Sequence, residues 1–281
     1  MKNIRILAIA NFICFCIHVS LSYITQLKLV NKRDVGEISD AYPSLFTPAP
    51  ITFAIWGVIY ISLAAFCIYH VVMAFRFDKN HPANADLQNI GGWFMLNNLV
   101  TAGWLVVWTN NDILVALILI VIQLVTLIAM HVVLDIYDTR RNLASKAFTQ
   151  FPLSIYFGWI TIATIANTSV YLVSVSWNGF NWGLTEIQWA IIMISIAIII
   201  SLMVILVRRN VWYGLVVIWA LYGIILQRKA VDAAFYNDMI NFCRVGMGII
   251  AIACLFRLIK NNTGKSKTKT AGYPLAEQPL K

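Results

Sequence analysis

Long apolar segments alternate with short polar segments along nearly the whole chain. A helix that crosses a lipid bilayer needs about 20 mostly apolar residues. Eight segments meet this requirement, at residues 5–25, 49–75, 89–109, 112–136, 148–174, 186–207, 211–227 and 236–258. Because the apolar residues are continuous rather than alternating, the pattern predicts helices and excludes an outer-membrane β-barrel. We therefore expect an all-α membrane protein with about eight spans.

The first apolar segment follows Lys2 and Arg5, an arrangement that also begins a signal peptide. No small-x-small cleavage site follows it, and Asn11 and His18 interrupt its apolar run. We therefore expect this segment to be retained as the first membrane span.

The basic residues indicate how the spans are oriented. Cytoplasmic segments of membrane proteins carry an excess of Lys and Arg. If the N-terminus lies inside, most of the Lys and Arg residues lie inside too, and Arg244 is the one that falls within a span. Both termini are therefore predicted to be cytoplasmic. The basic residues left on the outside are Lys28, Lys32, Arg33, Arg228 and Lys229.

Two polar segments are longer than the other connections. The first outside loop, residues 26–47, has a length that is typical of loops that are either mobile or functional, and we interpret it as a lid over a cavity. The C-terminal segment 259–281 is rich in Lys, Thr and Asn and has no apolar period. This composition predicts a basic, disordered cytoplasmic tail.

Composition narrows the class of protein further. Apolar residues make up 60% of the chain and charged residues 12%, and the mean hydropathy is +0.76. These values exclude a soluble enzyme or a secreted domain and make the lipid bilayer the main partner.

All five cysteines lie in apolar segments without a CxxC pair, so neither disulfides nor a metal site is expected. No phosphate loop, zinc signature or serine-nucleophile motif occurs, and nothing indicates nucleic-acid binding.

Several polar and aromatic side chains lie within the predicted spans, where each polar group needs a partner inside the bundle. In the second span, Trp56 and Tyr60 are four residues apart and share one helix face. In the fifth span, Trp159, Ala163 and Asn167 follow one another at the same spacing. Two interpretations remain open for these groups: contacts that hold helices together, or the lining of a ligand cavity.

The third span carries Asn97, Asn98 and Thr101, followed by Trp104. The same two interpretations apply to these asparagines. Tryptophans near predicted span ends are instead interpreted as members of an interfacial aromatic belt. These are Trp108, Trp177, Trp182, Trp189 and Trp212.

Three groups of ionisable residues could carry chemistry. His70 and His131 lie near cytoplasmic span ends and could ligate a haem, or only form hydrogen bonds. His131 and Asp135 are four residues apart and could form a proton pair, or an ion pair at the helix end. Arg244 lies in the last predicted span, where a cation is costly. Glu186 is its expected counter-charge, unless the span begins later and Arg244 is interfacial.

The segment from Pro48 to Tyr60 resembles the second-helix motif of the tryptophan-rich sensory protein family. This family is also called the translocator protein or peripheral-type benzodiazepine receptor family. The Trp-x-x-x-Tyr half of the motif matches at Trp56 and Tyr60, and the third-helix pattern Leu-Asn-x-x-Trp is matched loosely by Asn97 and Trp104. The fifth span is similar to the family's last helix, Trp-x-x-Phe-Ala-Thr-x-x-Asn, at Trp159, Ala163, Thr164 and Asn167.

The resemblance covers residues 45–174 by motif and 5–25 by position. Because the family has five spans, it implies a translocator-like five-helix bundle over 1–175 and additional transmembrane helices over 176–258. It also implies a cavity open toward the long loop for a flat apolar ligand such as a porphyrin, haem or sterol. No cofactor, catalytic residue or metal ligand is firmly implied. The ligand-binding residues that it implies are Trp56, Tyr60, Asn97, Trp104, Trp159, Ala163 and Asn167.

Three functions remain open at this stage. The first is a plasma-membrane binding protein, sensor or carrier for a tetrapyrrole or another small apolar ligand. The second is a secondary transporter or permease for a small solute. The third is an enzyme that oxidises a bound porphyrin through tryptophan radicals, since such an activity is attributed to some members of the family. The last three spans could cap the bundle, mediate a homodimer or hold a second site.

Overall fold

The computed structural model describes residues 3–136, 142–177 and 183–270. Within these ranges, seven helices are long and apolar enough to cross a membrane. The bent pair α4 (Pro82–Ile90) and α5 (Trp93–Thr109) passes the same test when the two are taken together, which gives up to eight spans. The prediction of an all-α protein with about eight membrane spans is confirmed.

The seven long helices are α1 (Ile4–Gln26), α3 (Ile55–Arg76), α6 (Ile113–Val133), α8 (Phe151–Ser174), α9 (Glu186–Arg208), α10 (Val211–Asp232) and α11 (Asn237–Thr270). The 3-10 helix η1 (Pro50–Ala54) leads directly into α3. The short helix α7 (Leu143–Ser145) and the π-helical turn η2 (Lys146–Gln150) lead into α8. Helix α2 (Val35–Ala41) lies in the long loop between α1 and η1, so the candidate lid contains an ordered helix.

The third predicted span is broken near its start. The axes of α4 and α5 differ by 52°. Gly91 between them has φ +55° and ψ −124°, a backbone conformation that is open to glycine and strained for other residues. Hydropathy predicted one continuous span over 89–109 because it does not register a backbone bend.

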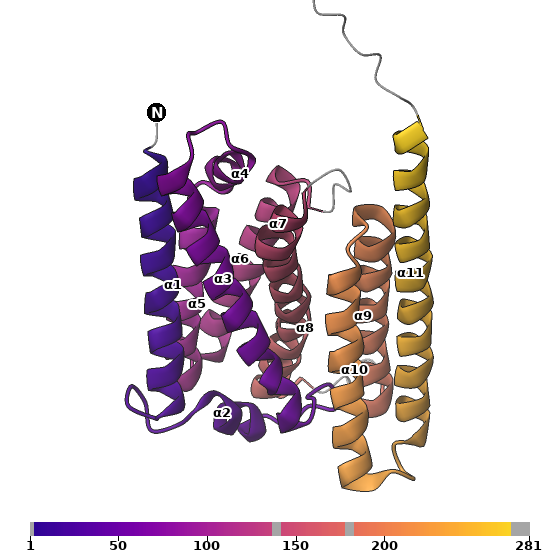
Figure 1. Cartoon of the computed structure of the whole chain (residues 1–281). Coiled ribbons are helices and arrows are strands. Elements are labelled where there is room, and N and C mark those ends of the chain that lie inside the picture. The colour runs from indigo at the N-terminus through magenta and orange to yellow at the C-terminus, as the bar shows by residue number, and fades with distance from the viewer. Residues whose placement is uncertain (1–2, 137–141, 178–182, 271–281) are drawn as a thin grey trace, which may run out of the picture.

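The two ends of the helical chain lie at the same end of the bundle, as expected when the bent pair is counted as one span (Figure 1). Figure 1 shows the start of α1 and the end of α11 at the upper end of the bundle, and α2 at the lower end. This arrangement agrees with the even number of spans expected from the basic residues. Assignment of the upper end to the cytoplasm stays a prediction from the positive-inside rule.

Helix α8 lies at the centre of the molecule. Figure 1 shows α1, α3 and α5 on one side of it and α9, α10 and α11 on the other. In its most apolar stretch 78% of the residues are buried, against 22% in α11. A Cβ at Gly158 would lie 3.0 Å from Cβ of Val216 and 3.1 Å from the carbonyl oxygen of Tyr213. The small residue therefore permits the close approach of α8 and α10 that joins the two sides.

Two helices continue beyond the ends that hydropathy predicts. Helix α10 runs to Asp232, and Arg228 within this extension is only 7% exposed. Its guanidinium lies over the ring of Tyr236, 5.2 Å from the ring centre, so the charge has an aromatic partner where the helix leaves the apolar layer. Helix α11 continues to Thr270, into the segment expected to be a tail, and residues 271–281 lie outside the described part of the chain.

Candidate functional site

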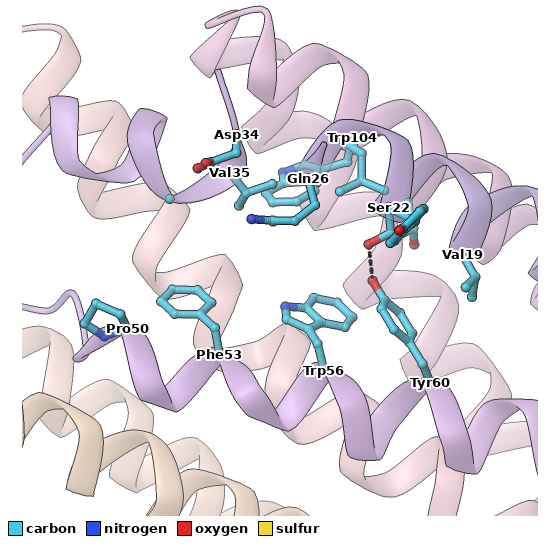
Figure 2. A pocket seen from close by; sticks show the side chains of 14 residues that line it. Val19, Ser22, Gln26, Asp34, Val35, Pro50, Phe53, Trp56, Tyr60 and Trp104 are labelled. Atoms are coloured by element: carbon cyan, nitrogen blue, oxygen red, sulfur yellow. Dashed lines mark hydrogen bonds between the residues drawn. The ribbon is translucent and has the colours of Figure 1, made fainter. Parts of the chain in front are cut away.

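A cavity of about 500 Å³ lies between α1, α3 and α5, with the start of α2 over its outer end. Figure 2 shows a row of side chains from η1 and α3 facing residues of α1, α2 and α5 across this space. The volume falls within the range of roughly 300–1,000 Å³ that is typical of small-molecule sites. The lining residues are Val19, Ser22, Tyr23, Gln26, Asp34, Val35, Gly36, Pro50, Phe53, Trp56, Tyr60, Thr101, Trp104 and Leu105.

The row on η1 and α3 follows from local sequence. Pro50, Phe53, Trp56 and Tyr60 are three or four residues apart, so they share one helix face. Pro50 occupies the first helical position, where its missing N–H costs no helical hydrogen bond. The ring centres of Trp56 and Tyr60 are 5.2 Å apart. The hydroxyl groups of Ser22 and Tyr60 share a hydrogen bond of 2.9 Å, which ties this wall to α1.

A second cavity of about 70 Å³ adjoins the first and reaches α8. Val35, Phe53, Trp56 and Trp104 line both cavities, so the two cavities are adjacent and share these side chains as a common wall. On α8 the second cavity is lined by residues that include Trp159, Ile160, Ala163, Ala166, Asn167 and Val170.

The Trp56 and Trp159 rings meet edge to face at the junction of the two cavities. Their centres are 6.2 Å apart and their planes differ by 82°. The indole N–H of Trp159 is buried and has no hydrogen-bond partner among the residues that the structure describes. A buried indole N–H normally finds a partner, so this group is available to an acceptor on a ligand.

The α5 wall is held by hydrogen bonds from two stacked indoles. The rings of Trp104 and Trp108 are 5.3 Å apart with planes 23° from parallel. Trp104 donates to the Asn167 side chain at 3.1 Å, and Trp108 donates to the carbonyl oxygen of Val35 at 3.1 Å. These bonds fix both rings relative to α8 and α2, so this wall is formed before any ligand arrives.

A buried polar cluster lies at the inner side of the cavity. The Thr101 hydroxyl lies 2.9 Å from the hydroxyl of Tyr156, 3.0 Å from Oε1 of Gln123 and 2.8 Å from the carbonyl oxygen of Asn97. Thr101 itself lines the cavity. The cluster therefore joins α5, α6 and α8 directly beside the ligand space.

Helix α2 is anchored over the mouth of the cavity. Asp34 caps its N-terminus in a capping box with Glu37. Nζ of Lys28 lies 2.6 Å from Glu37 and 3.5 Å from Asp34. The hydrogen bond from Lys28 lowers the pKa of the Glu37 carboxyl, and the same bond raises the pKa of Lys28. Asn31 also donates to the Thr109 hydroxyl at 2.7 Å, which attaches the loop to α5.

The structure brings six of the seven predicted ligand-binding residues to these two adjacent cavities. They are Trp56, Tyr60, Trp104, Trp159, Ala163 and Asn167. Asn97 lines neither cavity, and its amide donates to the Thr126 hydroxyl at 2.7 Å and to the carbonyl oxygen of Gln123 at 3.2 Å. It therefore holds α5 against α6. Its neighbour Asn98 bonds to His18 of α1 at 3.0 Å.

The ionisable groups considered from the sequence do not gather in one site. Nε2 of His70 lies 3.1 Å from the Thr149 hydroxyl, whereas His131 bonds to the carbonyl oxygen of Leu127. Helix α6 ends at Val133, so Asp135 lies beyond it and is not on the His131 face.

Arg244 is exposed on α11 and donates to Asn241 at 2.7 Å, so its partner is not Glu186. Among the described residues, no cluster of three or more His, Cys, Asp and Glu could hold a metal ion.

Several cavity residues were missed from the sequence. Trp108 was interpreted as a belt residue, but it is 3% exposed and lines the second cavity. It lies four residues after Trp104, and this spacing was the signal that could have placed it on the same face. Phe53 lines both cavities, three residues before Trp56. Of the other predicted belt residues, Trp177 and Trp189 meet edge to face, and Trp182 lies outside the described residues.

Comparison with known proteins identifies the family. The family model for TSPO-like protein matches residues 8–256. The match extends past the fifth span, where the recognisable motifs end, and includes the three C-terminal helices. No curated protein and no solved structure matches the chain. The chain therefore belongs to the TSPO-like family and is an integral multi-pass membrane protein with a binding or transport-related role.

Proposed function

We propose that the protein binds a flat apolar ligand of the tetrapyrrole class, a porphyrin or haem, and acts as its sensor or carrier. The ligand would lie across the two adjacent cavities between α1, α3, α5 and α8. The observation that carries this proposal is the group of indole rings at the junction of the two cavities. Trp56, Trp104 and Trp159 come from three different helices; the first two line both cavities and Trp159 lines the second.

Aromatic walls suit a flat ligand because indole faces stack on extended π-systems. Apolar side chains form most of the lining, and the polar groups of the larger cavity include Ser22, Gln26, Asp34, Thr101 and the hydroxyl of Tyr60. The free N–H of Trp159 supplies a donor for a ligand acceptor at the inner end. A few placed polar groups in an apolar cavity are typical of small-molecule sites.

The charged side chains of a tetrapyrrole would lie at the outer end under this proposal. Lys28 lies 3.5 Å from Asp34, which lines the mouth, and it is 42% exposed. A ligand carboxylate at the mouth would compete with Glu37 for the ammonium group. This position also keeps the ligand charge in the aqueous layer on the outer face of the plasma membrane, where we propose that the loop lies.

The test is quenching of intrinsic fluorescence by protoporphyrin in detergent. The wild type is compared with Trp56→Phe/Trp159→Phe and with Trp212→Phe, whose side chain is 42% exposed on α10 and lines neither cavity. The proposal expects saturable quenching in the wild type and in the control, and weaker binding in the double variant. Equal and unsaturable quenching in all three proteins would mean that porphyrin only partitions into micelles, and would refute the proposal.

A secondary transporter is the second candidate, and buried polar residues of α1 favour it. Asn11 and His18 are both almost fully buried within the bundle, and Ser22, one turn after His18 on the same helix, lines the cavity. Such residues inside a membrane protein often mark a substrate or ion path. This candidate expects gradient-driven uptake of a small solute into proteoliposomes, reduced by His18→Phe. Absence of uptake under proton and sodium gradients would count against it.

A further inference from the structure

Helix α10 contacts the segment that begins the cavity wall. Figure 1 shows the lower end of α3 beside α10. The contact between them is made by η1, the segment that leads into α3 and packs against α10. The indole N–H of Trp219 donates to the carbonyl oxygen of Thr52 at 2.9 Å. The backbone N–H of Ala49 donates to the carbonyl oxygen of Gly223 at 3.0 Å. Trp219 and Gly223 are one turn apart, so one face of α10 holds both the start and the middle of η1.

The contact at Gly223 leaves no room for a side chain. A Cβ there would overlap the hydroxyl of Thr52 and would lie 2.8 Å from its Cγ2 and 2.9 Å from its Cβ. Thr52 is only 1% exposed, and its Cβ is attached directly to the backbone. The distance between α10 and η1 is therefore set by the backbone of Gly223 against the buried side chain of Thr52, and an added atom at Gly223 must displace one of them.

The start of α3 depends on this contact. Neither η1 nor α3 has a side-chain cap at its N-terminus within the described residues. The first N–H groups of a helix have no partner inside the helix and need an external one. Of the N–H groups here, that of Ala49 donates to α10, and the carbonyl oxygen of Thr52 accepts a second bond from α10. The position of this end therefore follows the position of α10.

The same segment carries the aromatic wall of the ligand space. Phe53 immediately follows Thr52 and lines both cavities, and its ring meets the Trp159 ring edge to face at 5.7 Å. Trp56 follows one turn later and also lines both cavities. A shift of η1 therefore moves Phe53 and Trp56 relative to Trp159 on α8, and changes the width of the junction between the cavities.

We propose that α10 sets the geometry of the ligand cavity through Trp219 and Gly223, which act as positioning residues without touching the ligand. Of the three C-terminal helices, α10 is then part of the binding apparatus and does more than cap the bundle. The effect on affinity rests on the proposed ligand-binding function, whereas the effect on the position of Trp56 does not.

The first experiment measures the position of Trp56 without a ligand. The protein is labelled with 5-fluorotryptophan, and the ¹⁹F resonance of Trp56 is assigned by its loss in Trp56→Phe. We expect Trp219→Phe to shift or broaden this resonance, because the variant keeps an aromatic ring and loses the bond to Thr52. Trp212→Phe, a substitution at the other end of the same helix, should leave it unchanged. A Trp56 resonance that stays unchanged in Trp219→Phe overturns the proposal.

The second experiment measures affinity for protoporphyrin. Coupling between distant parts of a protein typically changes affinity by about 5–150-fold, and we expect Gly223→Ala and Trp219→Phe to weaken binding by about fivefold or more. Adding Thr52→Ala to Gly223→Ala removes the two nearest clashing atoms and should restore part of the affinity. Wild-type affinity in a folded Trp219→Phe would overturn the proposal. If the wild type itself binds no porphyrin, the proposed ligand is wrong, and the ¹⁹F result alone decides the role of α10.

Discussion

The Thr101 hydroxyl offers a sharp test of the structure beside the cavity, because Thr101→Val keeps the shape of the side chain and removes only its hydrogen bonds. The hydroxyl lies within hydrogen-bond distance of Tyr156, Gln123 and the carbonyl oxygen of Asn97. It has one proton to donate, so it can donate to one acceptor and accept from Tyr156 at any moment. The substitution therefore removes about two hydrogen bonds.

The expected loss of stability follows from these two bonds. Side-chain hydrogen bonds between membrane helices average about 0.6 kcal/mol each and reach about 1.7 kcal/mol, which gives about 1.2 kcal/mol for the pair. The Tyr156 and Gln123 side chains are buried and would lose this partner, which raises the upper limit to about 3 kcal/mol. A change of 1 kcal/mol lowers Tm by about 2–4 °C in proteins of 150–250 residues, so a decrease of at least about 2 °C is expected.

The assay is reversible unfolding in detergent, read by circular dichroism. Thr164→Val is the matched control, because the Thr164 hydroxyl bonds only to the carbonyl oxygen of Ile160 one turn earlier in the same helix. A double-mutant cycle of Thr101→Val and Tyr156→Phe isolates the bond between the two hydroxyls and should give a coupling of about 0.6 kcal/mol. Equal stability of the two threonine variants together with zero coupling would refute the cluster as described.

Three further predictions follow from other contacts. Lys28→Gln should weaken binding of protoporphyrin but not of its dimethyl ester, whose acids are blocked; equal weakening would contradict a carboxylate at the mouth. The bond to Lys28 lowers the pKa of Glu37 below its usual 4.5. The stability that this bond gives to the loop is therefore fully present above pH 4.5 and is lost as the pH falls through the lowered pKa of Glu37. The ¹⁹F resonance of Trp108, which reports docking of α2, should therefore stay constant at neutral pH and shift only in acid, and Glu37→Gln should abolish this dependence. Gly158→Ala should destabilise the protein by about 1–3 kcal/mol through crowding against α10, measured as a lower Tm; an unchanged Tm would contradict the close approach.

Local spacing along the chain was enough to identify part of the site. Trp56 and Tyr60, and likewise Trp159, Ala163 and Asn167, recur at helical intervals, and the structure places each of them beside a cavity. The interpretation failed on α5, where Asn97 contacts α6 and Trp108 lines the cavity. In a soluble helix the polar face would have marked the outside. In a membrane helix the lipid side and the packed side are both apolar, so the sequence pattern does not distinguish them.

The amino-acid sequence by itself determined the class of protein, the number of crossings and the shared side of the termini. Each of these depends on the length and polarity of single segments, because every span must match the thickness of the bilayer by itself and its flanking charges set its orientation. Only the tertiary structure decided which side chains meet. The Trp219 indole and the Thr52 carbonyl are separated by 167 positions in the chain, and they become neighbours because Gly158 and Gly223 let α10 approach α8 and η1. Such a contact depends on the shapes of several helices at once, and no local pattern of polar and apolar residues encodes it.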